Sequence, residues 1–187
     1  MSNIELEHRA LLSKEQYNSL LSKLNKIAND LGEDDKNVYF FIFPDKLLKV
    51  VNNISKNSAK IVLKLNKIGL GSDFEEIEIP IEPKDVEKSV HMFKSIGFNE
   101  LQESFQKRQN YLYKGVELAI KYSDNWGYHM ELEIILDNKN KIEKANKKIF
   151  AVAGELGLKI LTNQELKDFT RKIDSAYREK KSFKRQK

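Results

Sequence analysis

Three pairs of glutamates, each separated by one residue, are the part of this sequence best suited to chemistry. They are Glu5 and Glu7, Glu76 and Glu78, and Glu131 and Glu133. Residues two apart in a β-strand point to the same face, so each pair would place two carboxylates side by side. Crowded carboxylates repel one another, and a bound cation relieves that repulsion. The chain has no cysteine, and its three scattered histidines are expected to be structural. These oxygen ligands therefore predict Mg²⁺ or Mn²⁺.

Basic residues recur on the same strand faces as the glutamates. Arg9 follows Glu7 by two residues, and Lys64 and Lys121 occupy polar positions in other runs that alternate polar and apolar residues. Each strand taken alone is also consistent with a half-buried sheet whose charged face is solvated. Three Glu-x-Glu pairs, however, favour a metal site, and the neighbouring cations indicate that the metal arrives with an anion. Phosphate groups are the simplest such anion.

Eight runs of alternating polar and apolar residues predict the strands that position these side chains. They cover residues 4–11, 38–43, 47–51, 60–66, 75–81, 106–113, 116–122 and 129–136. Helical spacing of apolar residues predicts four helices. The first runs from a capping box at Ser13 to Gly32, the second from Pro83 to Gly97, the third over residues 141–156, and the fourth starts at a capping box at Thr162.

Strands joined mainly by hairpins, with helices gathered at a few points, predict an α+β fold with an antiparallel sheet. If this sheet curls into a closed or nearly closed barrel, the charged faces line its interior. The apolar faces then point outward, where the amphipathic helices would cover them. Trp126, in a predicted turn, is expected to pack on the rim of the barrel.

Length and charge limit the remaining possibilities. The 187 residues suit one domain, expected over residues 1–178, followed by a basic tail at 179–187. The 33 basic and 28 acidic residues are interleaved, which argues against a nucleic-acid partner. No signal-like or membrane-spanning apolar stretch is present in the sequence, so a cytoplasmic protein with no membrane partner is expected. The oligomeric state stays open, with a homodimer as one alternative.

The ordered set of motifs resembles the CYTH, or triphosphate tunnel, superfamily, which includes thiamine triphosphatases, inorganic triphosphatases and class IV adenylyl cyclases. The first strand of that family reads Glu-x-Glu-x-Lys, which resembles Glu5-Leu-Glu7-His-Arg9 here. The later motifs of the family resemble, in chain order, Ile61-Val-Leu-Lys64, Glu76-Ile-Glu78, Ile96-Gly97-Phe98, Lys107-Arg108-Gln-Asn-Tyr111 and, after a turn with Gly127, Glu131-Leu-Glu133. Together they extend from residue 4 to about residue 160.

This resemblance implies a tunnel of about eight antiparallel strands that binds a triphosphate or nucleotide with one or two Mg²⁺ or Mn²⁺ ions. The implied metal ligands are Glu5, Glu7, Glu131 and Glu133. The implied phosphate-binding residues are Arg9, Lys49, Lys64, Lys107, Arg108 and Lys121. Glu76 or Glu78 would orient the attacking water or, alternatively, pair with these cations.

Three positions depart from the pattern of the family. Phe74 stands where an arginine usually precedes the middle glutamate pair, and Lys49 followed by Val51 stands in place of Arg-x-Arg. Lys121 occupies the place of a metal-associated aspartate. Three functions therefore stay open: hydrolysis of an inorganic or organic triphosphate, formation of cyclic AMP from ATP, and binding of a polyphosphate or nucleotide without turnover. Phe74 and Lys121 favour the last of these.

Overall fold

The computed structural model describes residues 4–43, 45–65 and 73–185, without the side chains of 73–75 and 179–185. The strands are β1 (Ile4–Leu11), β2 (Asn29–Glu33), β3 (Lys36–Ile42), β4 (Leu47–Asn53), β5 (Ser58–Lys64), β6 (Asp73–Ile81), β7 (Leu101–Tyr113), β8 (Val116–Ser123) and β9 (Gly127–Leu136). The helices are α1 (Lys14–Ile27), the short 3₁₀ helix η1 (Pro83–Asp85), α2 (Val86–Ser95), the short 3₁₀ helix η2 (Lys139–Lys141), α3 (Ile142–Leu156) and α4 (Asn163–Arg185).

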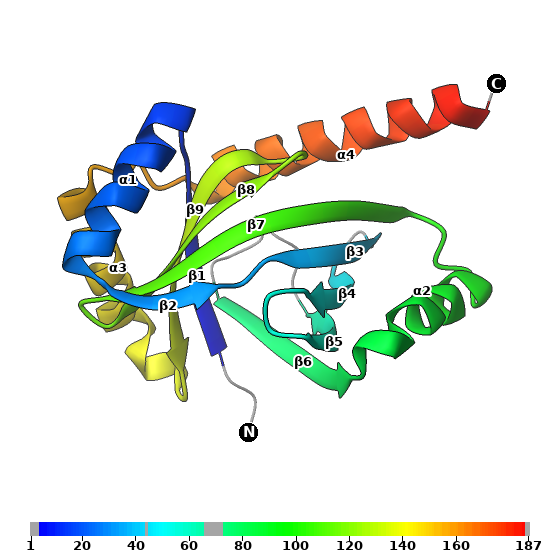
Figure 1. Cartoon of the computed structure of the whole chain (residues 1–187), viewed down its shortest axis with the longest axis horizontal. Helices are drawn as coiled ribbons and strands as arrows, with labels where there is room; N and C mark the ends of the chain where they lie inside the picture. The colour runs from blue at the N-terminus through cyan, green and yellow to red at the C-terminus, as the bar shows by residue number, and fades with distance from the viewer. Residues whose placement is uncertain (1–3, 44, 66–72, 186–187) are drawn as a thin grey trace.

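The strands form one antiparallel sheet that curls around a central space (Figure 1). Their order is β2-β7-β3-β4-β5-β6-β1-β9-β8, and a further ladder pairs β8 with β7. The seam between β1 and β6 is short, with three paired positions that begin at Ile4 opposite Glu75. The adjoining β1–β9 ladder is longer and pairs Ile4 through Leu11. The prediction of an α+β fold with a closed or nearly closed antiparallel barrel is confirmed.

The charged layer is innermost and the apolar layer lies outside, as predicted. On the outer face of β8 and β9, Leu118 and Leu132 are fully buried against Leu24 of α1 and Ile149 of α3. Helix α2 covers a second outer cluster, which contains Phe41, Leu48, Val50, Val86 and Val90. Burial of these apolar side chains stabilises the barrel from its outer face. Its inner face carries the charged groups, together with an apolar patch of Val38, Phe40 and Val51 on β3 and β4.

The end of the first helix differs from the prediction. Helix α1 ends at Ile27, and the segment predicted as its last turn forms strand β2 along the edge of β7. Strand β7 is long, and β3 pairs with its Leu101–Gln106 half, so β2 pairs with the half from Gln109 to Leu112. This pairing outweighs the local helical pattern. Gly32, with φ of 87°, lies next to a register shift in β2 and does not cap a helix.

Helix α4 begins where the sequence predicts and packs across one end of the barrel. The Glu165 amide donates to Thr162 Oγ1 at 3.2 Å, and the Thr162 amide donates to Glu165 Oε2 at 2.9 Å. Further along, Gln102 of β7 donates to Asp174 at 2.9 Å. The helix continues to Arg185, while the side chains of the predicted tail lie outside the described residues. Among the described helices, none is both long and apolar enough to cross a membrane.

Candidate functional site

The barrel encloses a cavity of about 810 Å³ with strongly charged walls. Among the described residues, eight carboxylates and eight lysine or arginine side chains line it. The carboxylates belong to Glu5, Glu7, Asp34, Glu76, Glu78, Glu117, Glu131 and Glu133. The cations belong to Arg9, Lys36, Lys49, Lys56, Lys60, Lys64, Arg108 and Lys121. Such an interior can bind a polyanion only if cations, resident or added, outweigh the carboxylates around it.

The structure brings the predicted site residues together, with Lys107 as the exception. Neighbouring residues of a strand point to opposite faces. Arg108 of β7 therefore faces the cavity, while Lys107 is exposed on the outer surface. This placement corrects the expectation that Lys107 joins the site. The backbone of Phe74 lies in β6, but its side chain lies outside the described residues.

A row of carboxylates crosses three neighbouring strands inside the barrel. Glu7 of β1 lies opposite Glu133 of β9, and Glu133 lies opposite Glu117 of β8. Burial, followed by the negative charges of Glu5 and Glu7, raises the pKa of Glu133 to about 9. Burial also raises the pKa of Glu7 and outweighs the opposing effect of Arg9. At neutral pH this wall therefore retains a proton unless a further cation neutralises it.

The donor chemistry of this wall fits a hard divalent cation. Glu5, Glu7 and Glu133 offer carboxylate oxygens, and the raised pKa values of Glu7 and Glu133 indicate a local shortage of positive charge. In the described part of the chain, no group of three or more His, Cys, Asp or Glu side chains is already arranged to hold a metal ion. Lys64 Nζ lies 2.6 Å from Glu5, and Arg9 contacts Glu7. A metal would thus compete with these internal ion pairs.

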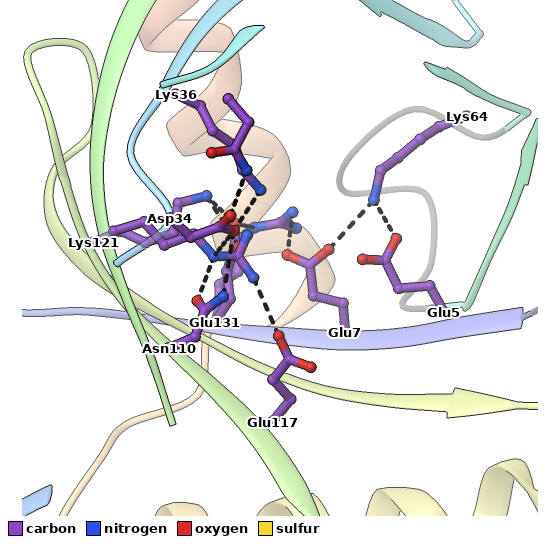
Figure 2. Close-up of polar contacts among 12 residues, drawn as sticks. Glu5, Glu7, Asp34, Lys36, Lys64, Asn110, Glu117, Lys121 and Glu131 are labelled. Carbon is purple, nitrogen blue, oxygen red and sulfur yellow. Dashed lines mark hydrogen bonds and ion pairs between the residues drawn. The ribbon is translucent and has the colours of Figure 1, made fainter. Parts of the chain in front are cut away.

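Glu131, the fourth predicted metal ligand, is surrounded by cations (Figure 2). Lys121 Nζ lies 3.0 Å from both of its carboxylate oxygens, Arg9 Nε donates at 3.2 Å and Arg108 Nη1 lies at 3.5 Å. Burial opposes ionisation of Glu131, but the charges of Lys121, Arg9 and Arg108 outweigh it and hold its pKa well below the usual value. Lys121 thus acts as a built-in counter-charge to Glu131.

Lys64 of β5 joins the first glutamate pair to the middle pair. Its Nζ lies 2.6 Å from Glu5, 3.4 Å from Glu7 and 2.6 Å from Glu76 (Figure 2 shows the first two contacts). Burial disfavours the charge of Lys64, but the surrounding carboxylates outweigh it and raise its pKa. Glu78 lies farther out on β6 and pairs with Lys60, and both side chains are partly exposed.

Several residues of the cavity were not predicted as site residues, among them His129, Asp34 and Lys36. His129 precedes Glu131 by two residues, so strand alternation could have placed it on the same face. Burial, followed by the charge of Lys121, lowers its pKa to about 4, which keeps its ring neutral. Asp34 lies in the β2–β3 connection and Lys36 opens β3, both between the predicted helix end at Gly32 and the predicted strand start at Val38.

Trp126 lies at one end of the cavity, between the barrel and α4. Its ring is 5.6 Å from Arg9 Cζ, 5.2 Å from the His129 ring and 5.1 Å from the Phe169 ring of α4. The expectation that Trp126 packs on the rim agrees with this position. Through these contacts Trp126 links α4 to a cation of the cavity.

Comparisons with known proteins agree with this architecture. A family model described as the CYTH domain matches residues 3–165. The PH1012 protein of Pyrococcus horikoshii is 26% identical, with 83% of this chain and 91% of that chain covered and a TM-score of 0.68. HpAC1 of Hippeastrum, described as having a dominant triphosphatase activity, is 17% identical, with 84% and 89% covered and a TM-score of 0.59. A Vibrio parahaemolyticus protein with a provisional assignment as an adenylate cyclase is 15% identical, with 84% and 91% covered and a TM-score of 0.67. No curated protein matches the sequence.

Proposed function

Because the chain belongs to the CYTH domain family, we propose that it hydrolyses a triphosphate-containing substrate inside its barrel with the help of Mg²⁺ or Mn²⁺. The observation that carries this proposal is the enclosure of eight carboxylates and eight cations in one cavity of about 810 Å³. This volume is typical of small-molecule sites. Arg9 and Lys64 are buried there and Arg108 is partly buried, and all three make charge-assisted contacts, which suits them to phosphate oxygens.

The proposed roles divide between the walls of the cavity. Glu5, Glu7 and Glu133 would hold the divalent ion, which when bound supplies positive charge to neutralise phosphate oxygens. Arg9, Lys49, Lys64 and Arg108 would bind and align the phosphate chain. Since three cations already surround Glu131, we assign that carboxylate to positioning Lys121, Arg9 and Arg108.

The middle glutamate pair divides in the same way. Glu76 is largely buried beside Lys64 and faces the cavity, so it is the candidate for orienting the attacking water. Glu78 pairs with Lys60 at the partly exposed edge of the cavity, so we assign it the role of an ion-pair partner for the cations. Loss of turnover with retained binding in Glu76→Gln, but not in Glu78→Gln, would support this division.

One observation favours a second candidate function, which is binding of a polyphosphate or nucleotide without turnover. Lys121 Nζ contacts both oxygens of Glu131 at 3.0 Å and so places an ammonium group of the protein itself inside the cavity. A resident lysine neutralises phosphate but cannot supply the Lewis acidity of a metal. The same charge would strengthen binding of the anion, so the two candidates differ in turnover and not in affinity.

The deciding experiment is an incubation of the purified protein with inorganic triphosphate, thiamine triphosphate or ATP, each with Mg²⁺ or Mn²⁺, followed by chromatography of the products. The Glu5→Gln/Glu7→Gln variant keeps the shape of the site but removes two charges. Phosphate release that this variant loses would support hydrolysis, while cyclic AMP would reassign the protein as a cyclase. Thermal stabilisation by triphosphate without any product would favour the binding protein. The absence of both turnover and thermal stabilisation would contradict both candidate functions.

A further inference from the structure

A second cluster of charges lies in the cavity, around Asp34 at the β2–β3 connection. Asp34 is buried, and three cations converge on its carboxylate (Figure 2 labels Asp34 and Lys36). Lys36 Nζ lies 2.6 Å from Oδ2, Arg108 Nε lies 3.4 Å from Oδ2, and Lys56 Nζ lies 3.2 Å from Oδ1. These residues come from β3, β7 and the β4–β5 turn, so the fold assembles them from distant parts of the sequence.

Two asparagines fix the orientation of the Asp34 carboxylate. Asn53 Nδ2 donates to Oδ1 at 2.5 Å, and Asn110 Nδ2 donates to Oδ2 at 3.3 Å. Asn110 also accepts a hydrogen bond from Arg108 Nε at 2.6 Å through its own Oδ1. The carboxylate and the guanidinium are therefore held by neutral groups as well as by each other. Such support is typical of a pre-arranged site and not of a flexible surface ion pair.

Positive charge exceeds negative charge in this cluster. Lys36 and Lys56 both contact the carboxylate of Asp34. Arg108 contacts the same carboxylate and also those of Glu131 and Glu117. Burial, followed by the positive charge of Arg108, lowers the pKa of Lys36 to about 8, even though Asp34 opposes this shift. One carboxylate thus does not balance the cations around it. An anion bound among them would relieve their mutual repulsion.

Lys36 and Lys56 lie across the barrel from Glu7 and Glu133, while Arg108 of β7 reaches toward the acidic row through its contact with Glu117 at 3.7 Å. Strands β3 and β4 are separated from β1 and β9 by β5 and β6 on one side and by β7 and β8 on the other. Glu7 and Glu133 therefore face the cavity from the wall opposite Lys36. Lys56 is about half exposed at the β4–β5 turn, so the cluster reaches one mouth of the cavity. Trp126 and Leu47 lie toward the other end, where α4 packs.

We propose that Lys36, Lys56 and Arg108 form a subsite for the unsubstituted terminal phosphate of a linear polyphosphate, and that Asp34 is the residue that positions them. A terminal phosphate carries more negative charge and more free oxygens than an internal one, which matches three converging cations. The subsite rests on the proposed function in one respect, which is that the ligand of the cavity carries a polyphosphate chain. It requires binding and not hydrolysis.

The test is calorimetric titration of the full chain with inorganic triphosphate, without divalent metal, at pH 7. Lys36→Gln should weaken binding about tenfold or more, and Lys56→Gln several-fold, because each loses a charged contact. Lys107→Gln is the matched control, since this lysine is adjacent in sequence to Arg108 but outside the cavity. Lys36→Arg should restore most of the affinity. Circular dichroism would check that each variant is folded, and the half-exposed Lys56 offers a variant with little risk to folding.

A second ligand separates a terminal subsite from general attraction of anions. A dinucleoside triphosphate has a phosphate chain with no free end, so its binding should change less than twofold in Lys36→Gln and Lys56→Gln. Normal triphosphate affinity in both variants, with loss in Arg9→Gln, would overturn the subsite and leave the proposed function in place. Equal losses for both ligands would also overturn it. Failure of the unchanged protein to bind triphosphate without metal would overturn the subsite alone, and failure in the presence of Mg²⁺ as well would also overturn the proposed function.

Discussion

Glu7 of β1 and Glu133 of β9 lie directly opposite one another, and both line the cavity. The register of the two strands fixes this pairing, because a shift by one residue would turn Leu6 and Leu132 out of the outer core. The repulsion between the two carboxylates thus cannot be relieved by moving a strand. It can be relieved by a proton, by a neighbouring cation or by a metal ion.

We predict that Glu133 makes the metal-free protein less stable as the pH rises. The pKa of Glu133 is raised from 4.5 to about 9, so the folded state binds more protons than the unfolded state between these values. Its contribution to stability is therefore present below about pH 4.5 and lost as the pH rises toward 9. In Glu133→Gln, the decrease in the free energy of unfolding between pH 5 and 9 should be smaller by about 2 kcal/mol or more. Melting temperatures from pH 5 to 9 in the presence of a chelator would measure it.

The control for Glu133 is Glu143→Gln, which changes a glutamate of α3 whose side chain is 82% exposed. Its pH profile should match that of the unchanged protein. Addition of Mn²⁺ should stabilise the unchanged protein and the control, but not Glu133→Gln. Parallel pH profiles for all three proteins would contradict the prediction.

We predict that Lys121 stabilises the fold through Glu131. Lys121→Met leaves Glu131 with Arg9 and Arg108, so the loss should be smaller than that of a buried pair with no other partner, at about 1–3 kcal/mol. Urea unfolding would give the value. Lys88→Met is the control, because Lys88 pairs with Asp85 on the surface and is 80% exposed. A loss as small as that of the control would show that Glu131 does not need the lysine.

The sequence was sufficient to predict the layers of the barrel, because polar and apolar residues alternate clearly in β1, β8 and β9. Leu6 beside Glu7, and Leu132 beside Glu133, already identify the outer and inner faces. The capping boxes at Ser13 and Thr162 also located two helix starts. Strand β2 could not be predicted in this way. It forms because part of the edge of β7 is not paired with β3, and this is a property of the assembled sheet.

The site was predictable where the strand faces differ in polarity and ambiguous where they do not. In β7, both the outward residues, such as Lys107 and Gln109, and the inward residues, such as Arg108 and Asn110, are polar. Alternation alone therefore could not show which face enters the cavity. Asp34 was missed for a different reason: its partners come from three separate segments, and no local spacing brings them together.

We predict that Trp126 holds α4 against the barrel. Trp126→Ala removes an edge-on contact with Phe169 at 5.1 Å and the contact with Arg9 at 5.6 Å. The loss should be about 2 kcal/mol, with faster hydrogen exchange in the first half of α4 than elsewhere. Met92→Ala, at a half-exposed position of α2, is the control. Exchange that rises equally in all helices would indicate general destabilisation and contradict the role in docking α4.

We predict that affinity for inorganic triphosphate falls as the pH rises through about 8. Burial, followed by the charge of Arg108, lowers the pKa of Lys36 to about 8, and burial with the charge of Lys64 does the same for Lys49. Asp34, Lys56 and Lys121 are the other charged groups close to Lys36, and none of them removes this shift. Above pH 8 both lysines lose their protons in the free protein, and each lost charged contact should weaken binding about tenfold.

The measurement for this pH effect is calorimetric titration at pH 7, 8 and 9 at constant ionic strength, with the unchanged protein and with Lys36→Arg. A guanidinium keeps its charge over this range, so the variant should lose affinity less steeply. The triphosphate titrates identically in both series, so the difference between their slopes belongs to Lys36. Identical slopes would mean that Lys36 stays charged to pH 9 or does not contact the anion. A residual slope that Lys49→Arg then removes would assign the remainder to Lys49.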